Sequence, residues 1–113
     1  MTRDQLIAQT RRLIVEGDRL AAQPSLPALR TWIAFSDDLL RTAWGSMDRY
    51  HLAWLMVGRP SDTVRGRALT PAEEGAYVRE VAAAKTAALR MSLKAVEEDG
   101  MPFLGETTGP TPG

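Results

Sequence analysis

Apolar side chains between residues 27 and 57 keep one helical register along the whole segment. They recur at steps of three and four residues, which places them on one side of an α-helix. The register is not reset at Gly45 and Ser46, so the pattern predicts one continuous helix that bends at this pair. Two shorter helices are the alternative. The register comprises Leu29, Trp32, Ile33, Ser36, Leu40, Ala43, Trp44, Met47, Tyr50, His51 and Trp54, and Phe35, Leu39 and Leu55 widen the apolar arc to about 200°.

A second helix is predicted before this segment, over residues 2–22. Its apolar stripe is narrower, about 140° wide. Thr2 and Gln5 have the spacing of a capping box, in which each side chain accepts a bond from the other residue's backbone amide. Pro24 and Pro27 prevent the helix from continuing, because proline lacks the amide donor and disfavours helix in the residue before it.

A third helix is predicted over residues 70–98. Thr70, Pro71 and Glu73 combine a capping hydroxyl, a proline at the first helical position and a glutamate that can reach back to the cap amide. Gly100 marks the end of this helix. Its apolar residues also sweep an arc of nearly 200°, which is wide for a helix on a protein surface.

These three patterns predict an all-α fold, a small bundle of three long helices. Residues 1–100 form the helical domain, and residues 101–113 form an extended polar C-terminal tail. Phe103 and Leu104 are apolar exceptions in this tail and could hold it against the domain.

The two wide apolar arcs exceed what a bundle of three helices can cover. A stripe of about 140° serves two neighbouring helices. The excess therefore predicts a contact with another chain, either in a homodimer that completes the bundle or as an accessory subunit of a larger assembly. The alternative is that the aromatic side chains fill the core of a monomer. The residues expected to bind the partner are Trp44, Trp54, Leu55, Leu89 and Leu93.

The composition favours a protein partner over a nucleic acid. The chain has 14 basic and 14 acidic residues and a formal net charge of zero, so no overall field attracts polyanions. The absence of cysteine excludes disulfides, thiolate nucleophiles and cysteine metal clusters. No stretch reaches the roughly 18 apolar residues of a membrane span, and we expect a cytoplasmic protein with no membrane contact.

No catalytic or cofactor site is predicted. His51 is the single histidine, and Asp48 precedes it by three residues, a spacing that suits a shared metal ion on one helix face. Such sites need further inward carboxylates, whereas the other acidic side chains mostly occupy the solvent sides of their helices. We therefore expect a non-enzymatic interaction module without a bound metal or cofactor.

One loop supports an alternative function. Residues 58–67 contain three arginines, two glycines and two hydroxyl side chains, a composition able to hold a phosphate group. The alternative is a regulator associated with a nucleotide or nucleic acid, which would bind phosphate through Arg59, Arg65 and Arg67. The glycine spacing matches neither of the two common phosphate-binding motifs, so solvated loop charge is the favoured interpretation.

Overall fold

The computed structural model describes residues 1–57, 63–64 and 67–107. The regular structure of these residues is helical apart from one short antiparallel strand pair. The predicted all-helical fold is confirmed, but the described part contains four helices instead of three. In chain order the elements are α1 (Arg3–Ala22), α2 (Leu26–Trp44), α3 (Arg49–Met56), β1 (Thr63–Val64), β2 (Arg67–Ala68) and α4 (Pro71–Glu97).

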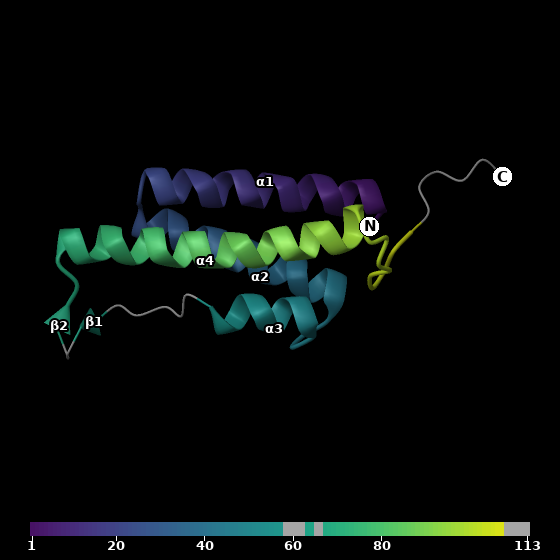
Figure 1. Cartoon of the computed structure of the whole chain (residues 1–113). Coiled ribbons are helices and arrows are strands. Elements are labelled where there is room, and N and C mark those ends of the chain that lie inside the picture. Colours follow the sequence, from purple (N-terminus) through teal and green to yellow (C-terminus); the bar gives the residue numbers. More distant parts are fainter. Residues whose placement is uncertain (58–62, 65–66, 108–113) are drawn as a thin grey trace.

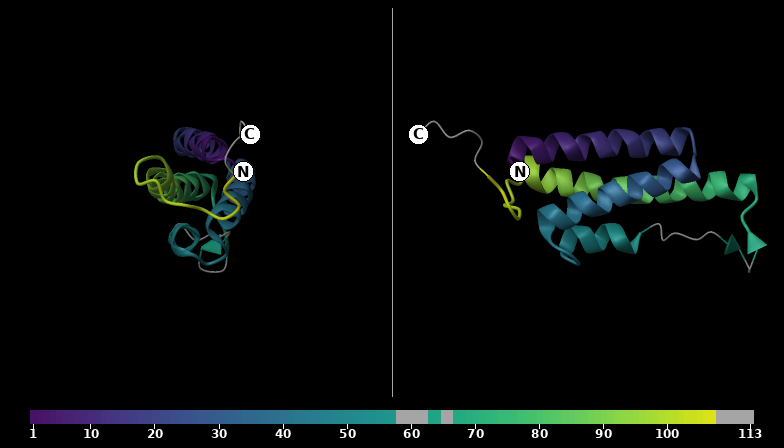
Figure 2. Two further views of the ribbon diagram at one scale, coloured as in Figure 1. Left: turned by 90° about the vertical axis from the view of Figure 1, so that its right-hand side faces the viewer. Right: turned by 180° about the vertical axis from the view of Figure 1, so that it is seen from behind.

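The longest helix, α4, contacts each of the other three helices (Figure 1). It runs antiparallel to α1 along most of the length of that helix. In the end-on view, α1 and α3 lie on opposite sides of the pair formed by α2 and α4 (Figure 2). The molecule is therefore a bundle of three long helices, and the short helix α3 packs against α2 and α4 on the side opposite to α1.

The two predicted capping boxes are confirmed. The Thr2 hydroxyl accepts a bond from the Gln5 amide at 3.1 Å, and the Thr70 hydroxyl accepts one from the Glu73 amide at 3.2 Å. In both cases the side chain of the third helical residue accepts a bond from the cap amide in return. These bonds satisfy amide groups that have no partner within the helix, which fixes where α1 and α4 begin.

The prediction of one continuous helix over residues 27–57 is wrong, and the alternative of two shorter helices is right. Gly45 has φ of 98° and Met47 has φ of 65°, so the backbone leaves the right-handed helical region at two positions. The Gly45 amide still donates to the Arg41 carbonyl at 2.9 Å, which closes α2. The chain then reverses, and α3 runs back along α4 (Figure 1). The apolar register persists because both helices bury the same side of the sequence pattern.

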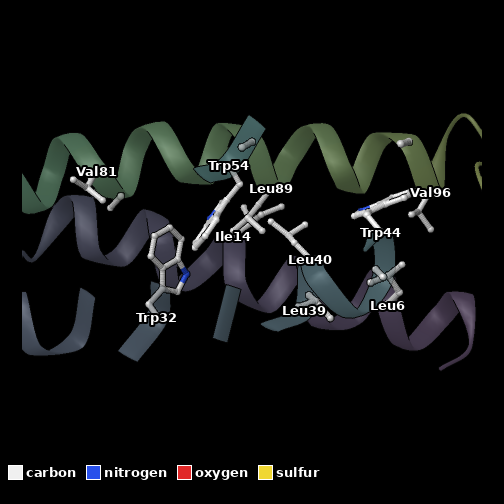
Figure 3. Close-up of a cluster of buried hydrophobic side chains, with 14 of the residues drawn as sticks. Leu6, Ile14, Trp32, Leu39, Leu40, Trp44, Trp54, Val81, Leu89 and Val96 are labelled. Atoms are coloured by element: carbon white, nitrogen blue, oxygen red, sulfur yellow. The ribbon is translucent and has the colours of Figure 1, made fainter. Parts of the chain in front are cut away.

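A close approach of α1 and α4 organises the core. Gly17 lies where a Cβ atom would come within 2.0 Å of the Thr86 hydroxyl and 2.8 Å of the Trp32 ring. Only glycine allows this contact without movement of its neighbours. Figure 3 shows part of the core, in which Trp32, Trp54 and Leu89 point inward from three different helices.

The segment after α4 closes one end of the bundle. The Met1 ammonium group donates to the Gly105 carbonyl at 3.0 Å, and the Leu104 amide donates to the Ala43 carbonyl at 2.7 Å. Arg3 forms a two-pronged ion pair with Glu106, with closest atoms 2.9 Å apart. Phe103 is buried, as the apolar residues of the tail suggested, whereas the Leu104 side chain is exposed.

Candidate functional site

Three of the five predicted partner-binding residues lie in the core of the single chain. The exposed fractions are 8% for Trp44, 1% for Trp54 and 0% for Leu89. Leu55 and Leu93 are half-buried against the same core. Trp54 and Leu89 therefore cannot present a contact surface in this fold, and Trp44 reaches solvent only at the edge of a groove beside the C-terminal segment, so that part of the site prediction needs correction.

The physical reason for this burial is the position of α3. The reversal after α2 places α3 over the part of α4 that a bundle of three helices would leave exposed. The apolar excess of both wide arcs is covered mainly within the chain.

The predicted phosphate-binding loop falls largely outside the described residues. Arg59 and Arg65 are not among them. Arg67 is described only as a backbone position in β2, where it pairs with Val64. The phosphate-binding alternative therefore stays a prediction.

A polar cluster connects α2, α3 and α4. The Asp37 carboxylate lies 2.6 Å from Nε2 of His51 through one oxygen and 2.8 Å from the Arg41 guanidinium through the other. The Met47 amide donates to Nδ1 of His51 at 2.9 Å. Nδ1 is therefore an acceptor, and Nε2 carries the proton that points at Asp37. Both ring nitrogens are occupied in holding the α2–α3 junction.

Lys85 completes this cluster from α4. Its ammonium group donates to the Trp54 carbonyl at 2.8 Å and lies 4.0 Å from the centre of the Trp54 indole ring. The side chain is only 2% exposed. Burial lowers the pKa of Lys85 to about 8, and the charge of Asp37 opposes this shift. The bond engages a carbonyl in the last turn of α3, so Lys85 fastens that helix end to α4.

These polar side chains do not form a metal site. A metal ion would need a free nitrogen of His51, and both nitrogens have hydrogen-bond partners. Asp48 is the N-cap residue of α3, so it does not share a helical face with His51 in the way the sequence suggested. Across the described ranges, no group of three or more histidine, aspartate or glutamate side chains is placed to hold a metal ion.

A long apolar groove lies on another face, between α1 and α2. Its volume is about 800 Å³. The buried side chains of Trp32 and Leu39 lie on its α2 side, together with Phe35, which is 64% exposed. The other residues that line the groove are Met1, Gln9, Arg12, Leu13, Glu16, Leu20, Ala28, Thr31, Asp38 and Thr42.

Phe35 differs from the other large side chains of α2. It is midway between Ala28 and Thr42, the first and last residues of α2 that line the groove. The neighbouring apolar residues Trp32 and Leu39 are buried, whereas Phe35 is mostly accessible to solvent. An apolar groove with an exposed aromatic residue and a polar rim is the arrangement that surfaces for protein contacts adopt.

A second, smaller groove of about 420 Å³ lies beside the C-terminal segment. Trp44 and Tyr50 contribute to it, with ring centres 4.6 Å apart. Asp48 and Arg49 line it as well, so it carries both charge signs and no excess of either. Its smaller size gives it less surface to offer a partner than the groove between α1 and α2.

The sequence contained one signal for Phe35 that was not decisive. Phe35 belongs to the wide apolar arc of its helix, but so do many core residues. Phe35 can be distinguished from these core residues only when it is known which part of the arc α4 covers. The turn after α2 determines this, and the uninterrupted apolar register gave no sign of that turn.

Comparisons with known proteins do not assign a family. No family model, no curated protein and no solved structure matches the chain. Within the described residues, no helix has the length and apolar character needed to cross a membrane. The geometry of the chain itself therefore has to support any statement about function.

Proposed function

We propose that the protein is a non-enzymatic helical protein–protein interaction module whose contact surface is the groove between α1 and α2. The groove accepts an amphipathic helix of another polypeptide chain. The observation that carries this proposal is the 64% exposure of Phe35 in the middle of an apolar groove. Removal of this much phenylalanine surface from water is worth roughly 1–2 kcal/mol.

The dimensions of the groove suit a helix. The α2 side extends from Ala28 to Thr42, which corresponds to about 21 Å at the rise of an α-helix. A helix of about four turns matches this length. The apolar floor and the polar rim correspond to the two faces of an amphipathic helix, a common mode of peptide recognition.

The polar cluster supports an interaction role over a catalytic one. The side chains of Asp37 and His51 are bonded to each other. His51 also accepts a bond from a backbone amide, and Lys85 donates to a backbone carbonyl of α3. None of the three lines either of the two grooves. They stabilise the position of α3, so the proposal assigns no catalytic residue.

Photo-crosslinking tests the proposed surface. Benzoylphenylalanine replaces Phe35 in the full chain, and the protein is irradiated inside the cells that express it. The expected result is a covalent product with a polypeptide whose linked residues, mapped by mass spectrometry, repeat at steps of three and four along one helical face.

Met91 provides the matched control because it is another large apolar residue on a helix surface, with 55% exposure. The same reagent at Met91, which lies on α4, should give no product. Absence of a product from position 35, or products of equal yield from both positions, would show that the groove is not the contact surface.

A further inference from the structure

We infer that the chain packed against this groove is a second copy of the same chain, so that α1 and α2 of both copies form a four-helix bundle. The two-fold axis runs parallel to the helices. This inference rests on the proposed contact groove and adds the identity of its occupant. It follows from the relative levels of α1 and α2 and from the charges on the two sides of the groove.

One hydrogen bond establishes which residues of α1 and α2 lie at the same level. The Trp32 indole donates to the Leu13 carbonyl at 2.8 Å, and the Trp32 ring also lies beside Gly17. Phe35 follows Trp32 by three residues, about 4.5 Å further along α2. Since α1 and α2 run in opposite directions (Figure 1), the contacts of Trp32 with Leu13 and Gly17 put Phe35 close to the level of Arg12 and Leu13.

A two-fold rotation about an axis parallel to the helices keeps every residue at its level along the helices. It places α1 of each copy in front of α2 of the other copy, at the same level and antiparallel. Leu13, which is half-buried in the single chain, then faces Phe35 of the second copy. Every helix of the resulting bundle has antiparallel neighbours, an arrangement that helix dipoles favour.

The charges beside the groove favour a second copy over a foreign helix. Arg12 lies on the α1 side and Asp38 on the α2 side, and both are exposed. In the part of the chain that the structure describes, no ion pair involves either residue, whereas Glu16 has Arg19 at 3.3 Å. The rotation brings Arg12 of each copy close to the level of Asp38 of the other. Opposite charges placed in this way make the surface complementary to itself.

A charge exchange tests this pairing. Sedimentation equilibrium of the native protein at low salt should give twice the chain mass of 12.4 kDa. Arg12→Asp alone and Asp38→Arg alone should each weaken the dimer by about tenfold or more. The double variant should restore association, because the two charges then exchange sides. Arg79→Asp, an exposed change on α4, provides a control that should leave the dimer intact.

Two results would overturn the inference: a native protein that stays at 12.4 kDa at about 100 µM, or a double variant that remains as dissociated as the single variants. Circular dichroism verifies that each variant is folded.

The crosslink from position 35 distinguishes a failure of the groove as a contact surface from a failure of the second copy as its occupant. A product with a foreign helix leaves the groove's function standing and removes only the second copy, whereas no product at all removes both.

Discussion

At the scale of single residues, the packing of the core depends on one close contact that only glycine fits. Gly17 allows α1 to approach Thr86 and Trp32 closely enough for these side chains to fill the space between three helices. Gly17 follows Thr10 and Ile14 at helical spacing, so it lies on the buried side of α1. The closeness of that contact depends on the partners it meets, and the periodicity of one helix does not name them.

Gly17→Ala should lower the free energy of unfolding by about 1–2 kcal/mol. The added Cβ atom would lie 2.0 Å from the Thr86 hydroxyl, and this overpacking outweighs the better helix propensity of alanine. Gly75→Ala provides the matched control in α4, because its added Cβ would meet no atom within 4 Å beyond the adjacent backbone of its own helix, and it should stabilise the protein by about 0.5–1 kcal/mol. Urea denaturation measures both changes, and equal stabilisation by the two variants would disprove the tight contact at Gly17.

Lys85 makes the stability of the fold depend on pH. Its pKa is about 8 in the folded protein, below the 10.5 of a lysine in the unfolded chain, so burial of the charge disfavours folding below pH 8. This penalty decreases as pH rises from about 8 to 10.5 and amounts to roughly 3 kcal/mol in total. The free energy of unfolding of the native protein should therefore rise across this interval relative to that of Lys85→Met, as measured by urea denaturation. A constant difference between the two proteins would contradict the burial of the charge.

At the scale of elements, the junction between α2 and α3 determines the architecture. The apolar register predicted both helices but not the reversal between them, since the same periodicity continues on each side of Gly45. The reversal depends on two left-handed residues and on the Met47 amide, which donates to His51. Gly45 signalled a weak point in the helix, but nothing in the sequence indicated that Met47 adopts a conformation rare for a methionine.

Met47→Gly should stabilise the protein by up to about 1 kcal/mol. Met47 has φ of 65°, which is costly for a residue with a Cβ atom, and its exposed side chain loses little packing. Gly45→Ala should have the opposite effect, because φ of 98° is strained for alanine. Thermal unfolding of the two variants measures this contrast. Destabilisation by both would indicate that Met47 is not held in the left-handed region.

At the scale of the whole molecule, the chain covers most of the apolar excess that its sequence displays. The sequence predicted the helical fold class, both capping boxes and the existence of surplus apolar surface. It could not locate the face that stays open, because α3 covers the side of the bundle where Trp54 and Leu89 lie. The apolar surface that stays exposed includes the groove around Phe35, which α4 and α3 leave uncovered.

Sedimentation equilibrium of the native protein beside Phe35→Asp tests the central claim most directly. The groove and its self-association predict twice 12.4 kDa for the native protein and 12.4 kDa for the variant, because a buried carboxylate opposite Leu13 has no partner. Met91→Asp, on another exposed helix surface, should keep the native mass. Equal masses for the native protein and Phe35→Asp would contradict the claim that this groove joins two copies of the chain.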